Sequence, residues 1–158
     1  MRIAVGSDHA GYVLKEVLAG HLRELGHEVE DLGTHSEEPV DYPLYGAAVG
    51  RAVVGGAADL GLCVCGTGMG IGIAANKVDG VRAAVAHDVT TAHLARQHNA
   101  ANVLCLGGRI VGTEVAKESL EAFLAASPAG GRHSRRVEEI AELETSGTGV
   151  VAPQVRGA

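Results

Sequence analysis

LCVCGTGMGIGIAANK, residues 62–77, begins as an apolar run and then places glycine at positions 66, 68, 70 and 72. The apolar run that ends at Cys65 is typical of a strand buried on both faces of a parallel sheet. The glycine-rich loop after it leads into a predicted helix at 71–78. Cys65 is therefore either a small core residue at the end of a strand or a thiol beside a loop that can hold an anion.

The composition limits what these motifs can mean. The chain has 158 residues, 46% of them hydrophobic, which suits one compact domain. We expect a single domain over residues 1–145 and a flexible tail over 146–158, which is rich in glycine and small residues. The net charge of −6 argues against nucleic-acid binding. No apolar run reaches the roughly 20 residues of a membrane span, and the N-terminus resembles a first strand rather than a signal peptide, so we expect a cytoplasmic protein.

The cysteines point to reduced thiols. Cys63, Cys65 and Cys105 are an odd number in strand-like contexts, which disfavours a disulfide framework. Cys63 and Cys105 lie inside apolar strands, where we expect them to be core residues. Neither the cysteines nor the eight histidines show zinc-site spacing, so we expect no metal and no other cofactor.

Strand-like and helix-like segments alternate along the chain. The predicted strands are 2–8, 27–33, 60–66, 81–88 and 102–108, and the predicted helices between and after them are 12–26, 41–56, 71–78, 89–100 and 113–126. The apolar positions of the first helix are Val13, Leu14, Val17, Leu18, Leu22 and Leu25. The pattern predicts an α/β fold, a three-layer αβα Rossmann-like sandwich with a five-stranded, mostly parallel sheet.

Polar residues follow four of these strands, where such folds bind their ligands. The four groups are Ser7, Asp8 and His9; Cys65, Gly66 and Thr67; His87 and Asp88; and Gly107, Gly108 and Arg109. Loop amides and a helix N-terminus stabilise anions, so they would favour a thiolate at Cys65 and could hold a substrate oxyanion.

A nucleotide-binding module is the alternative. GTGMGIG departs from the GxGxxG fingerprint because the third glycine falls on Ile71 or Ile73. Asp88 nevertheless lies about where a ribose-binding acid is expected.

The stretch GGRHSRRVEEIAELE, residues 130–144, contains a second possible anion site. Arg132 and Arg136 are four residues apart and share one face of a predicted helix. Two guanidinium groups on one face suit a phosphate. The alternative is a solvated face with Glu138 and Glu139 as partners.

Five motifs in order resemble the type B ribose-5-phosphate isomerases, within the wider family that includes galactose-6-phosphate isomerase subunits: SDHAG (7–11), DYP (41–43), CGTGMGIGIAANK (65–77), RQHN (96–99) and GGRHSRRV (130–137). The resemblance covers about residues 1–145. It implies an aldose–ketose isomerase that interconverts ribose 5-phosphate and ribulose 5-phosphate in the pentose phosphate pathway, without a metal and through an enediolate. Allose 6-phosphate, galactose 6-phosphate or a tetrose phosphate stays open as the substrate, as does a subunit that needs a paralogue for activity.

The resemblance also implies the catalytic residues. Cys65 is the base that moves the proton between C2 and C1, and one subgroup instead carries a glutamate at the position of Ile71. Thr67 exchanges protons with the substrate oxygens. His98 opens the furanose ring with help from Asp8.

The binding residues follow from the same resemblance. They are the backbone amides of Gly66, Gly68, Met69 and Gly70 for the enediolate, His9, Arg132 and Arg136 for the phosphate, Tyr42 and Asn99 for the sugar, and Arg109 for additional positive charge. The implied assembly is a homodimer, or a tetramer, in which His98 and the C-terminal arginines of one subunit complete the pocket of the other.

Overall fold

A five-stranded sheet lies at the centre of the structure, a computed structural model that describes residues 1–146. The strands are β1 (Arg2–Ser7), β2 (Glu28–Asp31), β3 (Leu60–Cys65), β4 (Ala83–Val85) and β5 (Val103–Gly107). Their order is β2-β1-β3-β5-β4, and every pair of neighbours is parallel. The predicted α/β fold is confirmed, and the described sheet is fully parallel.

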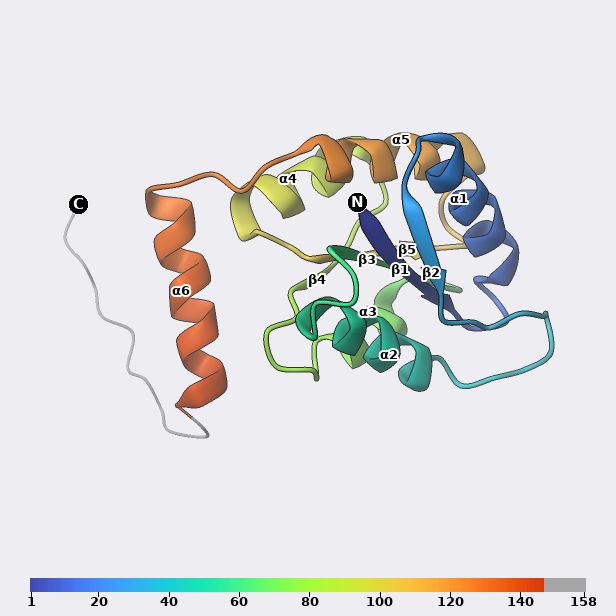
Figure 1. Cartoon of the computed structure of the whole chain (residues 1–158), viewed down its shortest axis with the longest axis horizontal. Helices are drawn as coiled ribbons and strands as arrows, with labels where there is room; N and C mark the ends of the chain where they lie inside the picture. Colours follow the sequence, from blue (N-terminus) through green and yellow to red (C-terminus); the bar gives the residue numbers. More distant parts are fainter. Residues whose placement is uncertain (147–158) are drawn as a thin grey trace.

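Helices cover both faces of the sheet (Figure 1). One face carries α1 (Tyr12–Glu24), α4 (Val89–Asn99) and α5 (Thr113–Ala125), and the other carries α2 (Tyr42–Val54) and α3 (Met69–Ala75). Strand β3 is buried along its whole length and supplies both cores, since successive side chains of a strand point to opposite faces. Leu62 and Val64 join the first core, whereas Cys63 and Cys65 join the second.

Helix α1 packs on the sheet through one face, as an amphipathic helix does. Of the six apolar positions, Leu14, Leu18 and Leu22 are buried, and the other three are between 37% and 59% exposed. The full buried set of α1 is Leu14, Lys15, Leu18, Ala19 and Leu22, the three- and four-residue spacing expected of an amphipathic helix that rests on one sheet face.

Lys15 is fully buried, which the sequence did not predict. Its Nζ lies 2.8 and 2.7 Å from the two carboxylate oxygens of Asp31 and 2.7 Å from Oε1 of Glu16. The ammonium also lies 5.5 Å from the centre of the Tyr12 ring. The buried charge is therefore paired, as a buried ammonium must be.

Strand β4 is shorter than predicted because it is the edge strand and pairs with β5 alone. Past it, Asp88 caps α4, and its Oδ1 accepts a hydrogen bond of 2.8 Å from the Thr91 amide. This cap lowers the pKa of Asp88 through the hydrogen bonds from Thr91. The carboxylate is therefore engaged at a helix end, which removes it as a ribose-binding acid.

Helix α6 (Arg132–Thr145) stands beside the sheet and its covering helices (Figure 1). None of its residues is buried. Its C-terminal part contacts the body where both carboxylate oxygens of Glu144 accept from the Gly80 amide at 3.0 Å. The predicted tail lies outside the described residues from position 147 on. No described helix is long and apolar enough to cross a membrane.

Candidate active site

The carboxyl ends of β1, β3 and β5 meet the loop before α2 around an open pocket of about 510 Å³. The lining residues are Asp8, His9, Ala10, Val40, Asp41, Tyr42, Cys65, Gly66, Thr67, Gly70 and Arg109. The fold thus brings together predicted site residues that follow three different strands, because parallel strands end at the same edge of the sheet.

Cys65 ends β3 and is 4% exposed. Its Sγ accepts a hydrogen bond from the Gly68 amide at 3.1 Å. Gly68 has a φ of 79°, a left-handed conformation that glycine adopts at low cost, and this turn brings its N–H to the sulfur. An N–H donor at this distance stabilises negative charge on the sulfur.

Cys63 and Cys105 have a different environment. Both side chains are fully buried. A hydrogen bond with Cys105, together with burial, raises the pKa of Cys63 well above its ordinary value. The prediction that these two cysteines are core residues is confirmed.

The loop after β3 is held by the end of β5. The carbonyl of Cys65 accepts from the Gly108 amide at 2.8 Å, and the carbonyl of Gly66 accepts from the Arg109 amide at 3.0 Å. In the loop and the first turn of α3, residues 66–71, four amides have no acceptor among the described hydrogen bonds: those of Gly66, Thr67, Gly70 and Ile71. Free N–H groups beside a thiol suit an anionic oxygen on a ligand.

Thr67 is a loop residue that packs against the end of β5. Its Oγ1 accepts a hydrogen bond of 3.3 Å from the amide of Met69, whose side chain is 55% exposed. A Cβ added to Gly107 would lie 2.8 Å from the carbonyl carbon of Thr67, so the backbone packs tightly there. Thr67 is therefore fixed at the pocket by close packing.

Arg109 places positive charge beside the loop. A Cβ added to Gly66 would lie 3.6 Å from Cδ and 3.7 Å from Nη1 of Arg109. No carboxylate among residues 1–146 forms an ion pair with this guanidinium. It is therefore free to interact with an anionic ligand.

Asp8 and His9 form the part of the pocket that follows β1. Asp8 is 6% exposed, and its Oδ1 accepts from the Gly11 amide at 2.9 Å. Nδ1 of His9 lies 3.2 Å from both the amide nitrogen and the carbonyl oxygen of Val40, and it bonds one of them according to its tautomer. This contact joins the loop before α2 to the end of β1.

Tyr42 begins α2 and lies against the glycine loop. A Cβ added to Gly70 would lie 2.7 Å from Cζ of Tyr42, so only glycine leaves room for the ring. Tyr42 and Gly70, both predicted site residues, therefore lie side by side at the pocket.

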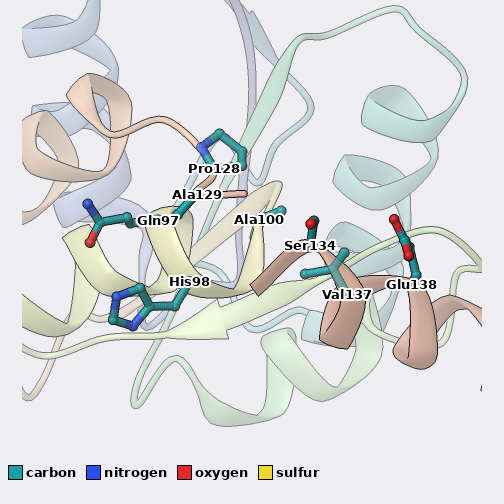
Figure 2. A pocket seen from close by; sticks show the side chains of 8 residues that line it. All are labelled: Gln97, His98, Ala100, Pro128, Ala129, Ser134, Val137 and Glu138. Carbon is teal, nitrogen blue, oxygen red and sulfur yellow. The ribbon is translucent and has the colours of Figure 1, made fainter. Parts of the chain in front are cut away.

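Six predicted site residues do not line this pocket: Gly68 and Met69 belong to the loop and helix beside it, whereas His98, Asn99, Arg132 and Arg136 lie on α4 and α6. His98 lines a smaller hollow of about 170 Å³ between the end of α4 and α6, with Ser134, Val137 and Glu138 on the α6 side (Figure 2). One chain therefore does not assemble the complete set of predicted residues.

His133 was not predicted and stacks on His98. Their ring centres are 4.2 Å apart and their planes 15° from parallel. Nε of Arg132 donates to Nε2 of His133 at 3.4 Å. Desolvation, followed by the charges of His98 and the two arginines, lowers the pKa of His133. The position of His133 next to Arg132 is the sequence feature that could have indicated a place at this site.

The loop before α2 supplies two further residues without a predicted role. Val40 and Asp41 line the pocket. Asp41 belongs to the DYP motif, whereas Val40 acts through its backbone, which no side-chain pattern reveals.

Residues 1–146 contain no group of three or more histidine, cysteine, aspartate or glutamate side chains arranged to hold a metal ion. The pocket groups that suit an anionic ligand are the loop amides that are unpaired in the described part of the chain, the Arg109 guanidinium and the His9 imidazole.

Comparison with known proteins identifies the family. The family described as Ribose/Galactose Isomerase matches residues 3–140. The chain is 51% identical over 143 residues to ribose-5-phosphate isomerase B of Escherichia coli, covering 90% of this chain and 96% of that protein.

Solved structures agree. Ribose-5-phosphate isomerase B of Clostridium thermocellum superposes with a TM-score of 0.91 at 49% identity, over 92% of this chain and 99% of that one. The Mycoplasma genitalium enzyme, solved with bound ribulose-5-phosphate, gives 0.89 at 41% identity, over 92% and 97%. This chain is an aldose–ketose isomerase, and it belongs to the ribose/galactose isomerase family.

Proposed function

We propose that the protein interconverts ribose 5-phosphate and ribulose 5-phosphate with Cys65 as the base. The observation that carries this proposal is the hydrogen bond from the Gly68 amide to Sγ of Cys65, at the wall of the pocket. Abstraction of a proton next to a carbonyl needs a base that is deprotonated near neutral pH, and for a thiol the deprotonated form is an anion, which this donor stabilises.

The reaction moves one carbon-bound proton between neighbouring carbons. After ring opening by His98 and Asp8, the Cys65 thiolate removes the C2 proton and leaves an enediolate. Thr67 transfers a proton between the oxygens on C1 and C2. The Cys65 thiol then returns its proton to C1, which gives the ketose and regenerates the thiolate.

The glycine loop stabilises the intermediate. The amides of Gly66, Thr67 and Gly70 have no other acceptor in the described part of the chain. Fixed donors of this kind stabilise an oxyanion strongly because they need no reorganisation during the reaction. Arg109 adds positive charge beside them.

We further propose a homodimer with shared sites. Helix α6 has no buried residue, and the pocket lacks His98, Asn99, Arg132 and Arg136 from its own chain. Large apolar side chains are exposed on α2, α3, β4 and the start of α4: Leu44, Met69, Ile73, Val85 and Val89. A second copy that covers them would bring its own His98 and arginines to the pocket, where Arg132, Arg136 and His9 hold the phosphate while Tyr42 and Asn99 contact the sugar.

The cytoplasm is the proposed location, since an isomerase with free cysteines suits a reducing compartment. The substrate is tested by measuring ketose formation by the purified chain from each of four sugar phosphates: ribose 5-phosphate, allose 6-phosphate, galactose 6-phosphate and a tetrose phosphate. We expect the largest kcat/KM on ribose 5-phosphate. A larger value on another sugar phosphate would assign that sugar instead.

Shared sites are tested by mixing Cys65→Ala with the double variant Arg132→Ala, Arg136→Ala and measuring turnover near the KM of the parent, where the weakened phosphate binding leaves the double variant almost inactive. After joint refolding, half of the dimers are mixed and each holds one intact site, so about a quarter of the parent activity returns. A mixture that stays inactive while mixed dimers form would place both sets of residues in one subunit.

A further inference from the structure

A single peptide group joins His87 to Cys65. The carbonyl oxygen of Thr67 lies 3.2 Å from Nε2 of His87, and since a carbonyl only accepts, this nitrogen carries the hydrogen. The N–H on the other side of the same peptide belongs to Gly68 and points at Sγ of Cys65 from 3.1 Å. His87 holds one end of the peptide group whose other end contacts the proposed base.

Planarity makes these two contacts dependent on each other. The C=O and N–H of a trans peptide point in opposite directions within one rigid plane. A donor that fixes the carbonyl of Thr67 therefore also fixes the direction of the Gly68 N–H. Two hydrogen bonds in series through one peptide also polarise each other, which strengthens the donor that faces the sulfur.

Among the described hydrogen bonds of residues 65–68, the carbonyl of Thr67 is the one that a side chain holds. The carbonyls of Cys65, Gly66 and Gly68 accept from the backbone amides of Gly108, Arg109 and Gly72. The carbonyl of Thr67 instead accepts from the His87 imidazole. Gly68 itself tolerates a wide range of φ, so its own backbone gives the peptide little resistance to rotation.

His87 is well placed for this task. It follows edge strand β4, and its neighbour Asp88 anchors the backbone by capping α4. The imidazole therefore reaches the loop from a fixed point in the sheet layer, on the side of β5 away from β3.

We propose that His87 is a positioning residue for the base: it holds the Thr67–Gly68 peptide so that the Gly68 N–H stabilises the thiolate of Cys65. This proposal rests on the proposed function for its catalytic consequence. The effect of His87 on the Cys65 thiol, however, is measurable without a sugar.

Other groups that face Cys65 stay the same when His87 is changed. They are Asp8 and His9 after β1, Asp41 and Tyr42 at α2, Arg109 after β5, and the neighbouring thiol of Cys63. Differences among His87 variants therefore report the peptide rather than these groups.

The experiment compares His87→Phe, His87→Ala and His87→Gln, with His27→Ala as control. Phenylalanine keeps a ring without an N–H, whereas glutamine restores an N–H donor. His27 is a histidine of intermediate exposure at the opposite end of the sheet, and its ring contacts the N-terminus. Alkylation of Cys65 by iodoacetamide is followed by peptide mass spectrometry across pH 6–9, beside kcat and KM.

We expect alkylation of Cys65 near pH 7 to slow by about three- to tenfold in His87→Phe and His87→Ala, the size of one lost hydrogen bond. We expect kcat to fall by a similar factor with KM within about twofold, because the phosphate contacts are untouched. His87→Gln should recover most of both, and His27→Ala should match the parent.

Alkylation of Cys65 at the parent rate in both His87→Phe and His87→Ala would overturn the proposal. Alkylation that is as slow in His87→Gln as in those two variants would also overturn it. If the parent shows no ketose formation but the alkylation pattern holds, the substrate proposal fails and the positioning role stands. If either His87→Phe or His87→Ala does not fold, as judged by its melting curve, the other of these two is compared with His87→Gln, and that comparison tests the proposal.

Discussion

Cys63 and Cys65 lie two residues apart on the same face of β3, yet only Sγ of Cys65 accepts a backbone N–H among the described hydrogen bonds. Cys63 shares its hydrogen bond with Cys105, and that contact and burial raise its pKa. One strand thus presents a thiol that stays protonated and a thiol beside an anion-stabilising loop. The difference arises from the loop, since both side chains belong to the same core.

The first prediction tests Cys65. Cys65→Ala should abolish isomerisation, because it removes the proposed base at the carbon atoms, while binding of the phosphorylated sugar survives. Turnover and calorimetric binding measure the two effects. Cys63→Ala and Cys105→Ala should remain active and lose about 1 to 2 kcal/mol of stability through the smaller side chain. Near-normal turnover in Cys65→Ala would refute the assignment.

The second prediction concerns metals. Exhaustive chelation with EDTA should leave kcat and KM unchanged, because residues 1–146 offer no group of three candidate ligands and the proposed chemistry uses a thiolate and amide donors. Activity is measured before and after dialysis. Loss of activity that one specific divalent ion restores would contradict the mechanism.

The third prediction concerns the α6 arginines. Arg132→Ala and Arg136→Ala should each remove a charge-assisted contact of about 1.5 to 3 kcal/mol, roughly ten- to a hundredfold in binding. The change should appear mainly as a raised KM for the phosphorylated sugar, with a smaller loss of kcat.

Arg135→Ala is the matched control for this pair. Its guanidinium lies 3.7 Å from Glu139, and both side chains are about half exposed, so little stability or activity should be lost. If all three variants behave like the parent, the arginines form a solvated face and the glycine loop holds the phosphate.

The fourth prediction concerns the buried pair of Lys15 and Asp31. Lys15→Met leaves the partly buried carboxylate without its ammonium and should destabilise the fold by about 3 kcal/mol in urea unfolding at pH 7. The double variant Lys15→Met, Asp31→Asn removes both charges and should recover part of the loss. A stability of Lys15→Met equal to the parent would show that the pair contributes nothing.

The same pair predicts a pH dependence. Partial burial alone would raise the pKa of Asp31, but the hydrogen bonds from Lys15 and Gly33 and the charge of Lys15 outweigh it and lower that pKa. A lowered folded pKa gives stability that is present above the ordinary value near 3.8 and is lost as the pH falls through the folded value. Urea unfolding between pH 2 and 6 should show a shallower acid loss in Asp31→Asn than in the parent.

The order of the elements could be predicted from the sequence because it depends on local patterns. The apolar run that ends at Cys65 predicted a buried strand, and the glycines after it predicted a loop at the ligand-binding edge of the sheet. Helical and strand periods are set by neighbouring residues, so they are visible without the fold. The core positions of Cys63 and Cys105 followed for the same reason.

The contacts between those elements were decided by the tertiary structure. Strand order β2-β1-β3-β5-β4 brings the end of β4 beside the loop after β3, so that His87 meets the carbonyl of Thr67 twenty residues away. The same order places Asp31 at the end of β2 against Lys15 of α1, so that Lys15 is a buried charge. From the sequence alone, a lysine in an amphipathic helix is expected to face solvent. Such pairs depend on which strands become neighbours in space, and sequence periodicity carries no information about that choice.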